Sequence, residues 1–263
     1  MKRLIYQVAV GPQSKLYQKC IQSVKEYCEK YDITHIVQTI PLLMIKPDPF
    51  LSNRSEGASR LGYLPIFEKE NAFEYINSFD QIAIIDADIF IRDLAPNIFE
   101  DITSKYAFGA VAEREMPITP HYANKIKNYS IMQYANISHT GDYKPNAIGF
   151  EFYNMGVMVI NCEKFKPYLK GQKPREFLTR KEFKPFIDGM GNWKWSTDQT
   201  LLNYWVKKEI IPTLNMNWKW NGLYKGIEDN RLPEAYFINF FLKDKLPERG
   251  ENVQQLMKDI GVE

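Results

Sequence analysis

The stretch from Gln81 to Ile91 limits the possible fold of this chain more than any other. It is apolar and rich in β-branched residues, and two carboxylates, Asp86 and Asp88, interrupt it. A continuous apolar run of this kind is typical of a strand buried on both faces of a parallel sheet. Residues two apart on an extended chain face the same way, so the two carboxylates project together at or just past the end of the strand.

Two neighbouring carboxylates in an apolar setting repel each other and lose hydration. A divalent cation would neutralise both. Oxygen ligands suit Mg²⁺ or Mn²⁺, with substrate phosphates completing the coordination. The alternative is that Asp86 and Asp88 are only turn or capping residues, which is a common role of Asp where a strand ends. The return to Ile-Phe-Ile directly after them favours the metal site.

Apolar strands and amphipathic segments alternate along the chain, which predicts an α/β domain with a mainly parallel sheet covered on both faces. Ligands of such sheets bind beyond the carboxyl ends of the strands, where the acidic pair lies. We expect helices at residues 15–28, 58–76 (continuous or broken at Pro65), 198–208 and 252–260, helical pieces within 163–186, and a functional loop or lid with some short helix at 113–146. The expected strands are residues 4–10, 33–40, 81–91, 106–112, 150–161, 210–216 and 235–241.

The overall composition excludes several classes of function. The 34 basic and 32 acidic residues nearly cancel, so the chain has no global field to hold nucleic acid or an anionic membrane. No apolar run approaches the roughly 18 residues of a membrane span. The short apolar run near the N-terminus reads better as a first strand than as a signal peptide. Three scattered cysteines suit neither a disulfide framework nor a zinc site, which favours a reducing compartment. Since the sequence shows no membrane anchor, we expect the protein to act in the cytoplasm.

Four ordered motifs resemble those of GT-A glycosyltransferases, most closely the retaining glycogenin and lipopolysaccharide galactosyltransferase group (family 8-like). They are Ile-Ile-Asp-Ala-Asp-Ile-Phe-Ile, Tyr-Asn-Met-Gly-Val-Met-Val-Ile-Asn, Thr-Asp-Gln-Thr-Leu-Leu-Asn and Phe-Ile-Asn-Phe, and the resemblance runs from about Leu4 to Lys245. It implies a single GT-A domain, a Rossmann-like mixed sheet flanked by helices, with a nucleotide-binding half at 1–112 and an acceptor-binding half at 113–263.

The resemblance implies a metal and nucleotide site. Asp86 and Asp88 match the aspartates with which the family holds Mn²⁺ or Mg²⁺ against a nucleotide diphosphate, and Ala87 between them leaves room for a ribose. Asn239 stands where the family has a third metal ligand, a histidine, and an amide oxygen can still bind these ions. The alternative for Asn239 is a buried amide satisfied by neighbouring backbone.

Further positions match the family's nucleotide-sugar contacts. Lys243 and Lys245 resemble its lysine near the diphosphate, or are merely solvated, and Arg60 resembles its basic residue near the nucleotide sugar. The segment that would lie against the nucleotide base comprises Val8, Ala9 and Val10.

Asn154, Asp198 and Gln199 match the family's positions for the acceptor and the donor sugar. Gln is a feeble nucleophile, so we favour a front-face reaction in which the acceptor hydroxyl attacks from the side that the leaving group departs. Asp198 also fits a helix N-cap or first-turn acid, a role compatible with sugar binding. Tryptophans 193, 195, 218 and 220 offer either an acceptor platform or core packing.

The sequence therefore predicts a metal-dependent hexosyltransferase that uses a UDP-sugar donor and a sugar or glycan acceptor. We expect it to be a retaining enzyme, one that keeps the anomeric configuration of the donor sugar. Its rivals are an inverting enzyme with Asp198 or Glu151 as general base, a nucleotidyltransferase, and a nucleotide- or carbohydrate-binding protein on an inactive transferase scaffold. The nucleotidyltransferase is disfavoured because the Gly-rich loop and Arg-Lys typical of that class are absent near Gly11.

Overall fold

A six-stranded sheet forms the centre of the protein, in the order β2-β1-β3-β6-β5-β7. The computed structural model describes residues 1–11, 13–59, 61–102, 104–135 and 144–262. β6 runs antiparallel to both of its neighbours, and the other neighbouring pairs are parallel, which confirms the mixed, mainly parallel sheet. The strands are β1 (Arg3–Val8), β2 (Thr34–Gln38), β3 (Gln81–Ile85), β5 (Phe108–Ala112), β6 (Tyr153–Asn161) and β7 (Thr213–Asn215).

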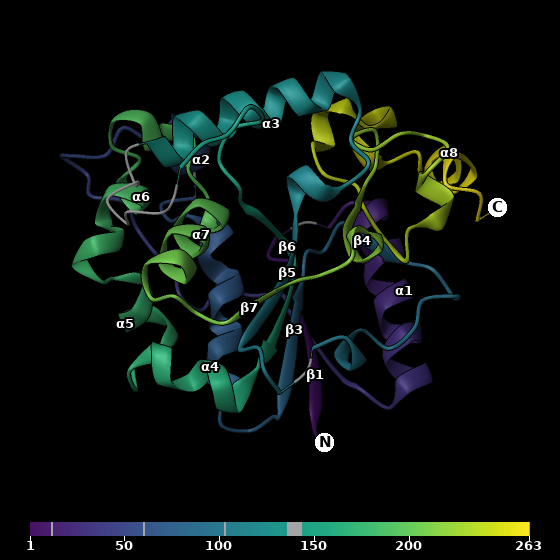
Figure 1. Ribbon diagram of the computed structural model, residues 1–263, viewed down its shortest axis with the longest axis horizontal. Helices are drawn as coiled ribbons and strands as arrows, with labels where there is room; N and C mark the ends of the chain where they lie inside the picture. Colours follow the sequence, from purple (N-terminus) through teal and green to yellow (C-terminus); the bar gives the residue numbers. More distant parts are fainter. Residues whose placement is uncertain (12, 60, 103, 136–143, 263) are drawn as a thin grey trace.

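Helices cover both faces of this sheet (Figure 1). α1 and α8 lie on one side, α4, α5 and α7 lie on the other, and α3 crosses above the edge at which β1, β3 and β5 end. Because both faces are covered, every residue of β3 and β5 is buried. The α-helices are α1 (Lys15–Tyr31), α2 (Glu56–Ser59), α3 (Pro120–Tyr134), α4 (Cys162–Leu169), α5 (Pro174–Leu178), α6 (Lys184–Asp188), α7 (Asp198–Lys208) and α8 (Val253–Asp259).

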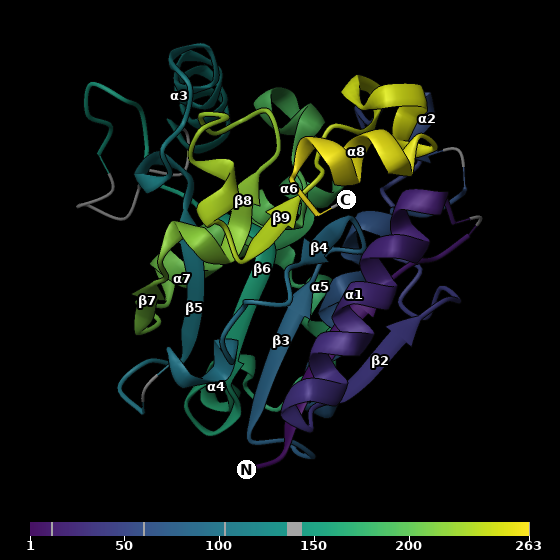
Figure 2. The same cartoon turned by 90° about the vertical axis from the view of Figure 1, so that its right-hand side faces the viewer.

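The predicted strand 81–91 is two strands in two sheets, which corrects the sequence-based expectation. The chain turns at Asp86–Asp88, and β4 (Ile89–Ile91) joins β9 (Phe237–Asn239) and β8 (Gly222–Leu223) in a small second sheet. Figure 2 shows this sheet beyond the upper end of β3. β9 pairs antiparallel with β4, placing Asn239 opposite Ile89. The turn therefore brings the acidic pair beside a strand that lies far away in the sequence.

Two helical predictions also need correction. The segment 58–76 is not one broken helix, because the short α2 ends at Ser59 and a separate 3₁₀ segment, η1 (Pro65–Tyr75), begins at a proline that favours a helix start. The stretch 113–146, expected to be mainly a loop, contains the 15-residue helix α3. Its first turn is fixed by Thr119, whose side chain accepts the Tyr122 N–H, and by Pro120. Residues 136–143 of that stretch lie outside the described residues.

The starts of two helices are fixed by their sequences. Ser14 caps α1 by accepting the Tyr17 N–H, and α7 begins at Asp198, in agreement with the helix predicted at 198–208. Cys20, Cys28 and Cys162 are buried free thiols. Within the described ranges, no helix has the length and apolar character needed to cross a bilayer.

Candidate active site beyond the central strands

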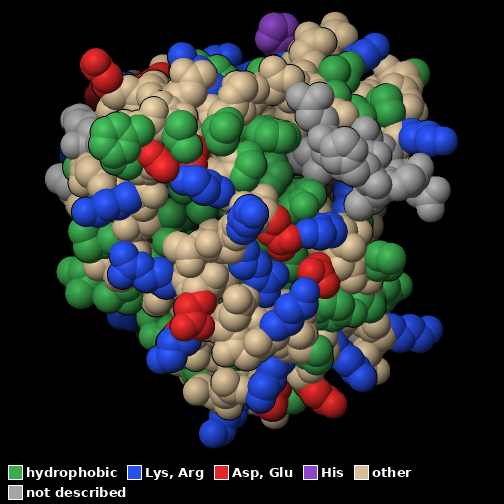
Figure 3. Space-filling view, turned by 90° about the vertical axis from the view of Figure 1, so that its left-hand side faces the viewer, with side chains coloured by type: hydrophobic (Ala, Val, Ile, Leu, Met, Phe, Trp, Pro, Cys, Tyr) green, Lys and Arg blue, Asp and Glu red, His purple; other side chains and the backbone are tan. Residues whose placement is uncertain are grey.

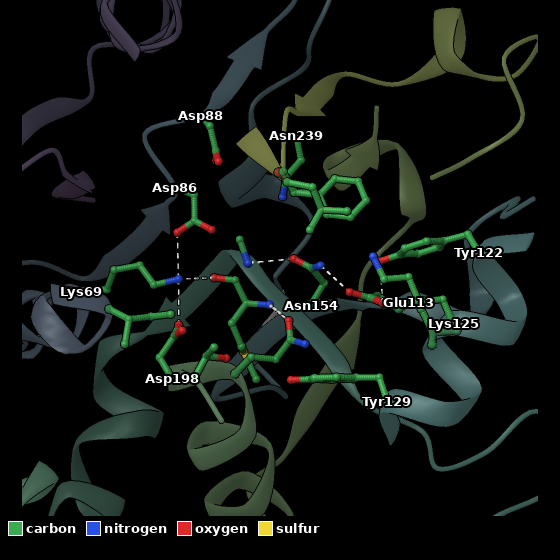
Figure 4. Close-up of a pocket in the computed structure, with 18 residues that line it drawn as sticks. Lys69, Asp86, Asp88, Glu113, Tyr122, Lys125, Tyr129, Asn154, Asp198 and Asn239 are labelled. Carbon is green, nitrogen blue, oxygen red and sulfur yellow. Dashed lines mark hydrogen bonds and ion pairs between the residues drawn. The ribbon is translucent and has the colours of Figure 1, made fainter. Parts of the chain in front are cut away.

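A pocket of about 340 Å³ opens beyond the carboxyl ends of the parallel strands. In α/β folds, ligands usually bind beyond the carboxyl ends of the strands. In this protein the antiparallel strand β6 begins at the same edge of the sheet. The lining comes from η1, the turn after β3, α3, the start of β6, the start of α7 and the end of β9. Figure 4 shows how these side chains converge. The polar and charged lining residues discussed below are Lys69, Asp86, Asp88, Glu113, Lys125, Asn154, Asp198, Gln199 and Asn239.

An irregularity at the start of β6 shapes the floor of the pocket. The register between β5 and β6 shifts between Ala110 and Val111. Backbone groups of β6 released by this shift are bonded by side chains: the Met155 N–H donates to Gln199 Oε1 at 3.2 Å, and the Gly156 N–H donates to Asn154 Oδ1 at 2.8 Å. The β-bulge therefore replaces sheet hydrogen bonds with contacts to site residues.

Lys69 occupies the centre of one wall. Its Nζ lies 2.8 Å from Asp86 Oδ1 and 2.7 Å from Asp198 Oδ2, and it donates to the Met155 carbonyl at 3.0 Å (Figure 4). Burial alone would lower the pKa of Lys69, but the negative charges of Asp198 and Asp86 outweigh it and raise that pKa. Lys69 is therefore a permanent cation that links two carboxylates from different elements.

Asp86, Asp88 and Asn239 lie together at one end of the pocket (Figure 4). Asp88 Oδ1 and Asn239 Oδ1 are buried and have no hydrogen-bond partner. Burial, followed by the charge of Asp86, raises the pKa of Asp88 to about 7, and burial also raises the pKa of Asp86. Two neighbouring carboxylates, one of them with an unsatisfied oxygen, and the unsatisfied amide oxygen of Asn239 fit a divalent cation, which would supply the missing positive charge.

The described residues contain no cluster of three His, Cys, Asp or Glu side chains suited to a metal ion. A third protein ligand at this place would therefore be the amide of Asn239. The backbone of β6 also leaves space there, because a Cβ on Gly156 would lie 2.6 Å from Asn239 Nδ2 and 3.2 Å from Asp86 Oδ2. Of the alternatives for Asn239, satisfaction by neighbouring backbone does not hold: its Nδ2 donates to the Asn221 side chain, and its oxygen is left free.

α7 contributes Asp198 and Gln199 to the lining, next to Lys69. Asp198 is the first residue of the helix, and its N-cap, Thr197, makes no side-chain capping bond. Asp198 is 3% exposed and is held by the ion pair with Lys69. Gln199 is held through its Oε1 by the Met155 N–H. These two side chains therefore have fixed positions, as a substrate-orienting site requires.

Glu113 closes the pocket on the side of α3. It follows β5, is 4% exposed, and accepts from Asn154 Nδ2 at 2.6 Å and from the Tyr122 hydroxyl at 3.3 Å. Burial raises its pKa to about 7, although both hydrogen bonds act in the opposite direction. Nothing in the local sequence around Glu113 distinguishes it from a solvated acid, so the sequence-based prediction missed it.

The remaining predicted nucleotide contacts are less closely gathered. Ala87 is buried between the two aspartates. Lys243 and Lys245 are exposed, with Lys243 Nζ 5.5 Å from the centre of the Tyr17 ring, and neither is among the lining residues. Arg60 lies outside the described residues. At the end of β1, on the same edge of the sheet but not in the pocket lining, are Val8, Ala9 and Val10.

Two cations of the pocket were not predicted. Lys69 stands between two glutamates in a sequence that resembles a solvated helix face. Lys125 projects from α3 into the lining, and burial together with the like charge of Lys245 lowers its pKa. One sequence feature could have indicated Lys125: Thr119 and Pro120 form a typical helix start, and Lys125 lies about one and a half turns into the helix that begins there.

The tryptophans do not form a platform in this pocket. Trp220 is buried, and Trp193, half-buried, donates from its ring nitrogen to the Gln133 carbonyl at 2.9 Å. Trp195 is exposed and Trp218 lies under the Arg231 guanidinium. None of the four lines the pocket, so the acceptor-platform expectation gains no support and Trp220 is a core residue.

A second cavity, of about 420 Å³, lies among residues 44–49, α5 and α6 and shares no lining residue with the first. Figure 3 shows this side of the molecule, with Lys and Arg side chains spread over it. Lys184 Nζ lies 2.9 Å from both Asp48 and Asp188, so one cation pairs with both acids of this cavity. Asp188 Oδ2 makes no hydrogen bond but faces this ammonium, whereas no ion pair among the described residues involves Asp88, whose Oδ1 also lacks a hydrogen bond.

Comparison with solved structures identifies the fold. A galactosyltransferase, LgtC, solved in complex with donor and acceptor sugar analogs, superposes with a TM-score of 0.53 at 14% identity, over 98% of this chain and 95% of that chain. An active-site mutant of LgtC gives a TM-score of 0.51 at 14% identity, over 97% and 95% of the two chains. The chain has the GT-A glycosyltransferase fold. No family model matches the sequence, and no curated protein matches it at the sequence level.

The GT-A fold confirms the resemblance drawn from the four sequence motifs. The alignment covers nearly the whole chain in both directions, so the match is not confined to a nucleotide-binding half. At this level of identity the likeness concerns the fold, and the donor, the metal and the reaction must be inferred from the pocket itself.

Proposed function

We propose that this protein is a metal-dependent glycosyltransferase that transfers a hexose from a UDP-sugar to a hydroxyl group of a sugar or glycan, with retention of configuration. One observation carries the proposal: within a GT-A fold, a single pocket joins Asp86, Asp88 and Asn239 at one end to Asp198 and Gln199 at the other. A nucleotide-sugar donor needs a metal site for its diphosphate and, next to it, polar side chains that bind its sugar.

The metal end of the pocket would hold Mn²⁺ or Mg²⁺ through Asp86, Asp88 and Asn239. When bound, such an ion neutralises the charge that develops on the departing diphosphate. Lys125, in the lining, is positioned to add positive charge for the phosphates, and Lys245 is the second lysine that we propose for this role. Lys69 keeps Asp86 in place from the opposite side.

The sugar end of the pocket would orient the donor. Asp198 is a carboxylate held by Lys69, and it offers acceptor lone pairs to sugar hydroxyls. The amide of Gln199 is fixed by the Met155 N–H, so it is set to lie along the donor sugar rather than to act as a nucleophile. Asn154 is held between Glu113 and the Gly156 N–H, which fixes its amide beside the bulge.

The state of the carboxylates favours retention by a front-face route. Asp198 is paired with Lys69, and both oxygens of Glu113 accept hydrogen bonds from Asn154 and Tyr122. In the front-face route the acceptor oxygen bonds to the anomeric carbon as the bond from that carbon to the phosphate oxygen breaks. The acceptor proton passes to the departing phosphate oxygen, so no protein base is needed.

The inverting alternative requires a base that faces the acceptor. Glu151 does not line the pocket. Its carboxylate is paired with Arg114, and its Oε1 lies 3.8 Å from Lys207 Nζ. Asp198 would have to leave Lys69 to accept a proton. The anomeric configuration of the product, read by proton NMR, separates the two routes, and an inverted product would overturn the retaining assignment.

Calorimetric titration with UDP tests the donor site. We expect wild-type binding in Mn²⁺ or Mg²⁺ that is lost in EDTA, and we expect Asp88→Ala to lose that metal-dependent binding. Asp93→Ala is the matched control, because Asp93 follows β4 as an exposed residue outside the pocket lining. Equal binding with and without metal would contradict the assigned role of Asp86 and Asp88.

Turnover separates an enzyme from a binding protein on the same scaffold. UDP-sugars are incubated with Mn²⁺ and a panel of oligosaccharide acceptors, and release of UDP is followed. We expect release that depends on both acceptor and metal. Metal-dependent UDP binding without any release across the panel would favour the binding-protein alternative instead.

A further inference from the structure

Four buried side chains from four separate elements form a continuous hydrogen-bond chain that ends at the proposed metal site. Asn239 Nδ2 donates to Asn221 Oδ1 at 3.0 Å, Asn221 Nδ2 donates to Asn154 Oδ1 at 2.8 Å, and Asn154 Nδ2 donates to Glu113 Oε1 at 2.6 Å. All four residues are less than 9% exposed. Asn221 lies at the end of the 3₁₀ segment Trp218–Asn221 and does not line the pocket.

The order of donors and acceptors along these hydrogen bonds is fixed by groups that can only donate or only accept. The backbone N–H of Gly156 can only donate, and it lies 2.8 Å from the Asn154 side-chain oxygen. The amide oxygen of Asn154 must therefore face Gly156, and its NH₂ must face Glu113, an acceptor with no donor of its own when ionised. The orientation of Asn154 is thus fixed by two neighbours rather than by chance.

Each later amide inherits its orientation from the one before. Because Asn154 presents its oxygen, Asn221 must turn its NH₂ toward it, which leaves the Asn221 oxygen facing Asn239. Asn239 must then donate with its own NH₂. Its Oδ1 is the atom left over, and it is buried without a hydrogen-bond partner. Turning Asn239 round would place its side-chain oxygen against the side-chain oxygen of Asn221, and two acceptors cannot form a hydrogen bond.

The oxygen left over lies at the pocket end that holds the acidic pair. Asn239 sits opposite Ile89, and the Phe240 N–H donates to the Asp88 carbonyl at 3.0 Å, so the two strands hold Asn239 beside Asp88. Asp88 Oδ1 is the other buried oxygen there without a partner. Figure 4 shows Asp86, Asp88 and Asn239 facing the same part of the pocket.

We infer that Glu113, acting through Asn154 and Asn221, is a positioning residue that holds the amide oxygen of Asn239 toward the divalent cation. This inference rests on the proposed function, since it needs a cation at Asp86 and Asp88. It explains how an amide serves where the resembling enzymes place a histidine: the chain presents a hard oxygen and turns the nitrogen away. The resulting all-oxygen ligand set favours Mg²⁺ or Mn²⁺ over ions that prefer nitrogen.

Metal binding without turnover is the direct readout. Mn²⁺ is titrated into the protein with saturating UDP, and free Mn²⁺ is followed by electron paramagnetic resonance. We expect Asn221→Leu to weaken Mn²⁺ binding by on the order of 10-fold, the usual effect of removing an outer-shell partner, although residue 221 touches no ligand. Asn221→Ser, which leaves room for the neighbours to relax, is expected to do the same if the leucine variant folds poorly.

A double-mutant cycle separates orientation from general damage. In an Asn239→Asp background both ends of the side chain are oxygens, so its orientation no longer matters. Adding Asn221→Leu there is expected to leave Mn²⁺ affinity unchanged or to raise it. An equal loss of affinity in both backgrounds would overturn the inference, because it would mean that Asn221 only supports the fold.

Two substitutions of Glu113 test the other end of the hydrogen-bond chain. Glu113→Gln keeps a carbonyl oxygen that accepts from Asn154, so we expect near wild-type Mn²⁺ affinity, whereas Glu113→Leu is expected to weaken it as Asn221→Leu does. Failure of the wild type to bind Mn²⁺ with UDP would contradict the proposed function itself. Wild-type binding with unaltered affinity in Asn221→Leu and Glu113→Leu would contradict only the positioning role.

Discussion

Lys69 and Asp198 form a buried ion pair, with 2.7 Å between Nζ and Oδ2, although Lys69 lies in η1 and Asp198 begins α7. Their side chains are 11% and 4% exposed, so water screens the pair little. The same ammonium reaches Asp86. One cation therefore connects the metal end of the pocket to the sugar end.

Replacing Lys69 by methionine is expected to lower the free energy of unfolding by about 3 kcal/mol at pH 7, because removal of one partner leaves buried carboxylates without a counter-charge. Urea denaturation measures this loss. The double variant Lys69→Met with Asp198→Asn removes one of the stranded charges and should recover part of the stability. A loss below about 0.5 kcal/mol for the single variant would show that the pair behaves as an exposed one.

The sequence could not have revealed this pair. Lys69 stands in Phe-Glu-Lys-Glu-Asn, a pattern typical of a solvated surface, and only the packing of η1 against the strand ends turns it inward. The acidic pair at Asp86 and Asp88 was visible because a strand and two carboxylates form a local pattern. A contact between residues far apart in sequence has no such local pattern.

The same difference explains the successes and failures in the fold. Apolar runs predicted the strands β1, β3 and β6, since burial on both faces leaves a continuous pattern in the sequence. The split of 81–91 into β3 and β4 was missed, because apolar residues on both sides of the turn look alike whichever sheet they join. The role of Asn221 was equally hidden: nothing in Trp-Lys-Trp-Asn indicates that this amide meets Asn154.

Glu70 should make stability depend on pH. It is 1% exposed, neither of its oxygens has a hydrogen-bond partner, and burial, followed by the charge of Asp198, raises its pKa well above the ordinary 4.5. The folded protein therefore keeps a proton that the unfolded chain releases above about pH 4.5. Stability from this group is fully present below that pH and is lost as the pH rises toward the folded-state pKa.

Glu70→Gln removes this proton linkage while keeping the shape of the side chain. We expect the variant to have nearly the same Tm as wild type near pH 5 and to become progressively more stable than wild type toward pH 8. The difference between their free energies of unfolding should grow by at most about 1.4 kcal/mol per pH unit. Thermal melts across this range, with Glu74→Gln as an exposed control on the same segment, check it. Parallel curves for wild type and Glu70→Gln would show that Glu70 ionises normally in the folded protein.

Gly156→Ala should damage the site through a single methyl group. The new Cβ would stand 2.6 Å from Asn239 Nδ2, 3.0 Å from Asn154 Oδ1 and 3.2 Å from Asp86 Oδ2, and overpacking of this kind costs about 1–3 kcal/mol. We expect lower stability together with loss of metal-dependent UDP binding, measured by calorimetry. Gly109→Ala, in the neighbouring strand β5, is the control, because its Cβ meets the flexible Met216 side chain at 3.1 Å. Metal-dependent UDP binding that survives in Gly156→Ala would mean that Asp86 and Asn239 do not need their close approach over β6.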